Sequence, residues 1–364
     1  MQSQAGEAGS NAPRRLSGIE AGRGLAAVLV ILYHAVRHLD QATEVPLLKM
    51  MLQFGHAGVD FFFVISGFII CFVHGADIGR PARIEHYVRQ RFTRLMPVYW
   101  IATALTLAAI ALTGRALPSV DAILWSITLL PLDYEAVLGI AWTLQHEMLF
   151  YAVFGILILN LKAGLVLLAA WLSVVVTSLT GADTGLPRTV VESYNLQFLF
   201  GMAAALILRS GPVRSPRLLL TAGIALFGMA GMLENVEVLD GYSTAARFAY
   251  GVPSALILIG LVEMERLNAL RVPAVLQILG ASSYSLYLFH ILCIGVAWQV
   301  LAATALNQML PPFLLLLLLA LSGILGGVVI SFAVERPLIR LLRQGRDRAA
   351  PASAGRMWRR WGGA

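Results

Sequence analysis

Long apolar runs, separated by short segments that carry charge, glycine or proline, constrain this chain more than any other feature of its sequence. A predominantly apolar stretch of about 18 residues or more is typical of a transmembrane helix, because about 20 helical residues cross the hydrocarbon core of a bilayer. The 364 residues are 58% hydrophobic and 13% charged, whereas soluble domains contain about a quarter charged residues. The sequence therefore predicts an all-α, polytopic membrane protein.

Ten candidate spans follow from these runs, and the basic residues between them give an independent check on that number. Lys and Arg accumulate in cytoplasmic loops, and in this chain they cluster in every second loop and near both ends. An even number of spans, with both termini in the cytoplasm, keeps these clusters on one side of the membrane, whereas nine or eleven spans do not. The predicted spans are 24–39, 57–74, 93–113, 138–160, 163–181, 194–208, 217–233, 246–262, 281–303 and 312–334.

The spans divide the chain into a polar N-terminal segment, a membrane domain and a basic cytoplasmic tail, with bounds 1–17, 18–337 and 338–364. Trp358 and Trp361 of the tail are suited to rest on anionic headgroups, although a solvated tail without a function is the simpler interpretation. The formal charge of +7 reflects arginines at the ends of spans, and no nucleic-acid-binding module is evident. The apolar stretch 121–131 is too short to span and is expected to be re-entrant or interfacial.

Several ionisable residues fall inside or at the ends of the predicted spans. A charged side chain in the hydrocarbon costs several kcal/mol unless it faces a cavity or a partner, so several in one chain predict a shared polar interior. The candidates are Arg23, His34, Asp60, Arg91, Arg94, Glu147, His290 and Glu335, with Ser66, Trp142, Tyr151 and Tyr284 as further polar residues of that interior.

Each candidate also has a simpler structural interpretation. His290 is equally compatible with a hydrogen bond to a neighbouring helix, and Arg91 and Arg94 with a role in setting topology. Glu335 and the following Arg-Pro are compatible with a helix stop that carries an interfacial ion pair. His34 is the strongest candidate, because imidazole can take and return a proton near neutral pH. We assign no function to two further histidines, His56 and His146.

These residues lie within six short motifs. An Arg-x10-His arrangement joins Arg23 to His34, and it is followed in order by "GVDFFFVISGFII", "RFTRLMPVYW", "WTLQHEMLFY", "SYSLYLFH" and a terminal "ERP". Any one of these motifs is weak, but six in this order are specific. From about Gly18 to Pro337, the chain closely resembles the acyltransferase-3 family of integral membrane acyltransferases.

The resemblance implies a ten-helix domain of the bacterial inner membrane that moves an acyl group, commonly acetyl from acetyl-CoA, onto a hydroxyl of a carbohydrate or glycolipid. In this family the histidine of the first helix is the proposed base and the arginine of the same motif is tied to the acyl donor, roles that carry over to His34 and Arg23. The Arg-x-x-Arg motif carries over to Arg91 and Arg94. Glu147 stands where many members have "EEQFY", whereas "QHEMLFY" here retains one acid.

A mechanism follows from the residues and the resemblance together. Coenzyme A is cytoplasmic and polyanionic, so an inner mouth lined by arginines is suited to hold its phosphates. At 1.5 Å per residue, Arg23 and His34 lie about 16 Å apart along one helix, which would be the separation between the donor's head and its reacting carbon. His34 would remove a proton from the acceptor hydroxyl, with Asp60 or Glu147 orienting the imidazole as an acid does in a triad. A covalent acyl intermediate on a histidine or on Ser66 is a less favoured variant.

The sequence indicates no bound cofactor and no metal. Cys71 and Cys293 fall inside apolar runs, so neither a disulfide framework nor a thiolate metal site is expected. Motifs of hydrolases, ATPases and zincins do not occur. Two alternatives stay open: a transporter or flippase, whose polar residues near the midplane would bind substrate instead of reacting, and an acyltransferase whose acceptor is a secreted small molecule.

Overall fold

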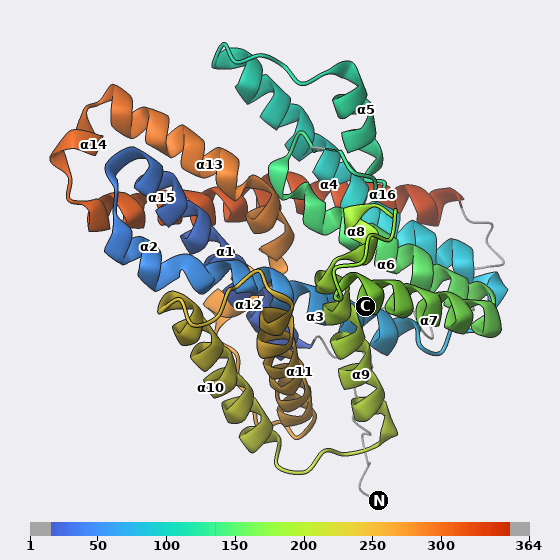
Figure 1. Ribbon diagram of the computed structural model, residues 1–364. Coiled ribbons are helices and arrows are strands. Elements are labelled where there is room, and N and C mark those ends of the chain that lie inside the picture. Colours follow the sequence, from blue (N-terminus) through green and yellow to red (C-terminus); the bar gives the residue numbers. More distant parts are fainter. Residues whose placement is uncertain (1–15, 135, 350–364) are drawn as a thin grey trace, which may run out of the picture.

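The fold is described from a computed structural model, which places residues 16–134 and 136–349 (Figure 1). Within these residues the chain forms helices and no strand. Nine helices are long and apolar enough to cross a membrane, which confirms the prediction of an all-α, polytopic membrane protein.

Some of the nine consist of two or three helical elements in succession. They are α1 (Ser17–Thr43); α2 (Pro46–Leu52), η1 (Gln53–Ala57) and α3 (Gly58–His74); η2 (Pro81–Arg83) and α4 (Ile84–Leu112); η3 (Gly139–Ala141) and α6 (Trp142–Leu159); α7 (Leu161–Ser178); α10 (Pro216–Asn235); α11 (Thr244–Arg266); α13 (Ser283–Ala303); and α15 (Pro312–Ile330), η5 (Ser331–Glu335) and the start of α16 (Arg336–Ala349). The shorter elements are α5 (Val120–Thr128), α8 (Arg188–Val191), η4 (Ser193–Asn195), α9 (Leu196–Ser210), α12 (Ala274–Ala281) and α14 (Leu306–Met309).

The predicted span 194–208 corresponds to α9, which is not among the nine. With 15 residues, it is about 22 Å long at 1.5 Å per residue, whereas the hydrocarbon core is about 30 Å thick. It nevertheless packs inside the bundle, between α3 and α11.

The helices α1 and α3 form the centre of the bundle. In Figure 1, α13 and α15 lie on one side of this pair and α9, α10 and α11 on the other, and α1 packs against α3, α11, α12, α13 and α15. The first helix therefore touches both halves of the molecule.

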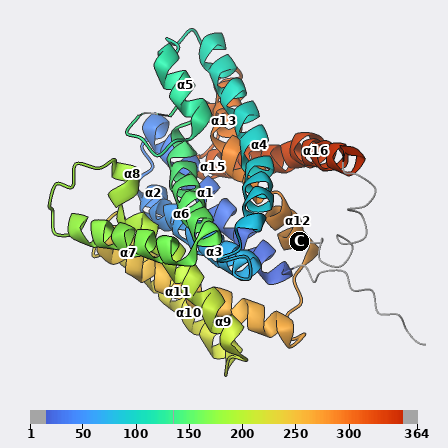
Figure 2. The same ribbon diagram turned by 90° about the vertical axis from the view of Figure 1, so that its right-hand side faces the viewer.

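Three expectations concern short or terminal segments. The stretch 121–131 overlaps a nine-residue helix, α5, which begins at Val120. The helix does not stop at the terminal "ERP" motif, because α15 continues through the π-helical turn η5 into α16, which extends away from the bundle in Figure 2. Part of the segment expected to be a loose tail is therefore helical, and Trp358 and Trp361 lie outside the described residues.

Glycines allow α3 and α9 to touch. A Cβ atom built on Gly201 would lie 2.0 Å from the carbonyl oxygen of Val64, and one on Gly67 would lie 2.1 Å from that of Phe198. We expect Gly201→Ala to force the helices apart and to lower the free energy of unfolding by about 1–3 kcal/mol. Thermal denaturation of the detergent-solubilised protein should show a lower Tm.

Gly295→Ala in α13 is the matched control for this change, because no heavy atom outside its own helical turn lies within 4 Å of the added Cβ. Both variants gain the same helix propensity, so only packing distinguishes them. Equal Tm values for the two variants would contradict the close approach of α3 and α9.

Candidate active site

An inner cavity of about 230 Å³ gathers the three arginines that the sequence assigns to the donor. Arg23 comes from the start of α1, and Arg91 and Arg94 come from the start of α4. We call this the inner cavity because the pattern of basic residues places these helix ends in the cytoplasm. Side chains from two helices that are far apart in the sequence thus share one space.

The arginines of the inner cavity keep donors available for an anion. Arg23 donates from Nε to Ser283 Oγ at 3.1 Å, and Arg91 donates from Nη2 to Gln90 Oε1 at 3.2 Å. Arg91 Nε is buried and has no hydrogen-bond partner. Planar guanidinium groups with free N–H donors suit phosphate and carbonyl oxygens.

Glu147 also lines the inner cavity, in the first half of α6. Its Oε1 accepts hydrogen bonds from Ser66 Oγ at 2.6 Å and from the Tyr151 hydroxyl. The cavity therefore holds one carboxylate among three guanidinium groups. Ser66 and Tyr151, predicted as residues of the polar interior, are the partners of this acid.

A larger cavity of about 770 Å³ lies at the opposite end of the same helices, and we call it the outer cavity. It is lined by the second half of α1, by η1 and by the segments that precede α6, α9 and α11. His34 belongs to its lining, as does Trp142. Val59 and Tyr287 line both cavities, so the two spaces meet at these side chains.

His34 is held by a backbone carbonyl and by a second histidine. Its Nδ1 lies 2.9 Å from the carbonyl oxygen of Val30 and 3.2 Å from His290 Nε2, while His290 Nδ1 lies 2.7 Å from the carbonyl oxygen of Tyr287. Because carbonyl oxygens only accept, both Nδ1 atoms carry hydrogen, and His290 Nε2 accepts from His34. In the neutral His34 ring, Nε2 is therefore the unprotonated, basic nitrogen.

The structure places neither expected acid against His34. Asp60 Oδ1 lies 2.5 Å from Arg247 Nη1, and both side chains are fully buried. Gln197 Nε2 donates to the same oxygen at 2.5 Å, and Glu147 faces the inner cavity. Asp60 forms an ion pair with Arg247 and is therefore not available to His34. Among the described contacts, the side chain that orients His34 is that of His290.

The remaining predicted residues are structural in their contacts. The Tyr284 hydroxyl donates to the carbonyl oxygen of Leu95 at 2.7 Å and lies on the wall of the inner cavity. Buried Glu335 accepts from Ser285 Oγ at 2.5 Å and from Ser331 Oγ at 3.2 Å. These bonds tie η5 to α13, and they take the place of the interfacial ion pair considered from the sequence.

Several residues of the site have no assignment from the sequence. Arg247 donates to the carbonyl oxygens of Gly241 and Ser243 as well as to Asp60. Its position inside the predicted span 246–262 was the available signal. Tyr242, in the segment that Arg247 holds, lines the outer cavity, and burial raises the pKa of its hydroxyl well above the ordinary value.

His146 lines the outer cavity but has no free ring nitrogen. Its Nδ1 lies 2.8 Å from Asn195 Oδ1, and its Nε2 lies 3.0 Å from Glu192 Oε2. Although burial alone would raise the pKa of Glu192, its hydrogen bond and charge interaction with His146, together with Arg188, lower it below the ordinary value. His146 thus anchors the segment before α9 through both of its ring nitrogens.

The Asp60–Arg247 contact separates a structural from a catalytic role for this acid. We expect Asp60→Asn to leave a buried, unpaired guanidinium and to cost about 3–5 kcal/mol of unfolding free energy, measured by thermal denaturation. The double variant Asp60→Asn, Arg247→Met should lose less unfolding free energy than the sum of the losses of the two single variants. Asp121→Asn, at an exposed acid, is the control. An Asp60→Asn protein with native Tm and no transferase activity would instead make Asp60 catalytic.

Comparison with known proteins identifies a family and a relative of this chain. The family model described as "Acyltransferase domain" matches residues 16–334. The chain is 32% identical over 320 residues to the "Exopolysaccharide production protein ExoZ" of Rhizobium meliloti (strain 1021), covering 83% of this chain and 94% of that protein. No solved structure matches the chain. The family match confirms the resemblance seen in the motifs and favours an enzyme over the transporter alternative. The chain belongs to this acyltransferase family and is a multi-pass membrane acyltransferase.

Proposed function

We propose that this enzyme takes an acetyl group from acetyl-CoA on the cytoplasmic side and transfers it to a hydroxyl of an exopolysaccharide intermediate on the outer side of the bacterial inner membrane. The observation that carries the proposal is the meeting of the two cavities at Val59 and Tyr287. An anion-binding space on one side and a histidine-bearing space on the other are what acyl transfer between compartments needs. The name of the Rhizobium relative supports an exopolysaccharide as the acceptor.

The donor side of the proposal rests on the inner cavity. Arg23, Arg91 and Arg94 surround it, and Arg91 Nε is a buried donor without an acceptor. A cavity of about 230 Å³ is too small for a whole coenzyme A molecule, whose charged head would remain at the arginine-lined mouth. The narrow thioester arm would then occupy the cavity and point towards Tyr287.

The chemistry of transfer is assigned to His34. Its Nε2 would take the proton of the acceptor hydroxyl, the hydroxyl oxygen would attack the thioester carbonyl, and the carbon–sulfur bond would break. The departing thiolate would take the proton back from Nε2. The imidazole is thus unchanged at the end of the cycle, and the products are an ester and free coenzyme A.

His290 would act on this chemistry through His34. Its Nε2 accepts from His34 Nδ1 at 3.2 Å, so it favours the tautomer with a basic Nε2. In a hydrocarbon environment a neutral imidazole is less costly to bury than a carboxylate, which is a physical reason for a histidine in the place that a triad gives to an acid.

His34→Ala tests the proposed base. We expect kcat for label transfer from radiolabelled acetyl-CoA to a glycan extract of the host membrane to fall by about 10²-fold or more, with the KM for acetyl-CoA unchanged. His38→Ala is the control, because His38 packs on Trp298 and lines neither cavity. Transfer at the native rate by His34→Ala, in purified protein, would contradict the proposal.

Arg91→Gln tests the donor site. Loss of a charge-assisted hydrogen bond should raise the KM for acetyl-CoA by about tenfold or more, while the KM for the glycan stays native. Arg89→Gln removes an exposed arginine two residues away that does not line the inner cavity, and it should behave as the native protein does. A higher KM for acetyl-CoA in both variants would contradict a specific donor site, because it would show that the arginines act through membrane topology or overall charge.

A further inference from the structure

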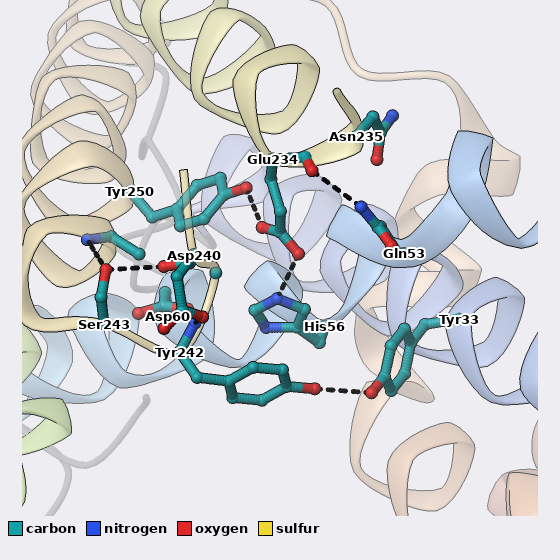
Figure 3. A network of polar contacts seen from close by, with 12 residues as sticks. Tyr33, Gln53, His56, Asp60, Glu234, Asn235, Asp240, Tyr242, Ser243 and Tyr250 are labelled. Carbon is teal, nitrogen blue, oxygen red and sulfur yellow. Dashed lines mark hydrogen bonds and ion pairs between the residues drawn. The ribbon is translucent and has the colours of Figure 1, made fainter. Parts of the chain in front are cut away.

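A second histidine of the outer cavity is held by a buried carboxylate. His56 in η1 lines the cavity, and its Nε2 lies 2.8 Å from Glu234 Oε1, with both side chains 7% exposed (Figure 3). The other oxygen of Glu234 accepts from the Tyr250 hydroxyl at 2.5 Å. Gln53 Nε2 donates to the backbone carbonyl of Glu234 at 2.7 Å, so both the carboxylate and its helix end are fixed.

The partners of His56 also fix its orientation. Its ring stacks on the Tyr242 ring, with centroids 4.6 Å apart and planes 12° apart, and meets Tyr33 edge-on at 5.6 Å. The Tyr33 and Tyr242 hydroxyls are 2.6 Å apart (Figure 3). Three side chains therefore hold the imidazole in one pose.

This arrangement determines which nitrogen of His56 can accept a hydrogen bond. Glu234 Oε2 accepts from Tyr250, and a carboxylate oxygen accepts, so we assign the hydrogen to His56 Nε2, which leaves a lone pair on Nδ1 of the ring. Acyl transfer as proposed returns its proton to the leaving thiol through His34, so it needs no second base. The pair of His56 and Glu234 is left for a different task.

The rest of the outer cavity indicates the kind of molecule that His56 meets. Aromatic side chains of Tyr134, Trp142 and Tyr194 form part of its walls. Aromatic rings combine an apolar face with a polar edge, which suits a sugar ring, whose C–H faces are apolar and whose edge carries hydroxyls. Each hydroxyl that enters such a buried site needs a hydrogen-bond partner.

We propose that His56, held by Glu234, accepts a hydrogen bond from a second hydroxyl of the acceptor sugar and so determines which hydroxyl faces His34. This inference rests on the proposed function. His56 is in this view a substrate-binding residue that sets the position of the ester, whereas His34 performs the proton transfer. A polyhydroxylated ring, and not a simple alcohol, is the class of acceptor that uses both histidines.

His56→Gln is the variant that tests this role. Gln places an amide nitrogen near the position of imidazole Nε2, so it can still donate to Glu234, but it has no counterpart of Nδ1. We expect the KM for an oligosaccharide, prepared from the host exopolysaccharide and freed of acyl groups by alkali, to rise by about tenfold. The KM for acetyl-CoA should stay native, and NMR of the product should show acetyl on more than one hydroxyl.

His38→Gln is the matched control, since it makes the same change on α1 outside the cavity lining. An acceptor KM within twofold of native and a single native regioisomer from His56→Gln would overturn the proposal. If His56→Gln lowers the Tm, the same measurements are made on the Glu234→Gln variant. Its amide can either donate or accept, so it no longer fixes the tautomer and should also raise the acceptor KM.

Direct binding separates this inference from the proposed function. If the native enzyme transfers no acetyl group to the oligosaccharide, the proposed acceptor chemistry fails, and equilibrium dialysis of the oligosaccharide without donor decides the role of His56. Weaker binding by His56→Gln than by His38→Gln would support a sugar-binding histidine. Equal binding by both variants, or none by the native protein, would overturn it.

Discussion

The cost of placing charge inside a membrane is the constraint on which this structure depends. A polar group buried in hydrocarbon without a partner is expensive, and each charged side chain described here meets a partner or a cavity. Asp60 meets Arg247, Glu335 meets two serines, and Glu147 meets a serine and a tyrosine. The helices pack as they do because these contacts join segments that lie far apart in the sequence.

The sequence allowed the class of fold and the residues of the inner cavity to be predicted. Apolar runs and basic loops are local properties, and they suffice to orient the helices and so to bring Arg23, Arg91 and Arg94 to one end of the bundle. The length of α9 was less predictable. This helix has only 15 residues, and close packing on α3 holds it in the bundle. The continuation through Pro337 was also missed, because proline is tolerated in the first turn of a helix, here α16.

Partners of buried charges were the least predictable part of the site. In the predicted spans, Asp60 and Glu147 are both acids at about the membrane depth of His34. Which side chains they contact depends on how α3, α6 and α11 are arranged beside one another. Arg247 and Glu234 come from segments with no motif, so their contacts with Asp60 and His56 could not be read from spacing. Hydrogen-bond geometry then supplied what residue type could not, namely which nitrogen of His34 is free.

The wall shared by the two cavities has a consequence for bioenergetics. Val59 and Tyr287 belong to both linings, and the Tyr287 hydroxyl is engaged by Thr143 and by the carbonyl oxygen of Ile140. A membrane potential drives each positive charge inwards with about 2.3 kcal/mol per 100 mV, so any continuous wet path through the bundle would leak protons. Val59 and Tyr287 stand where the two cavities meet, so the proposed passage of an acyl group between the cavities has to occur without opening a continuous water-filled path.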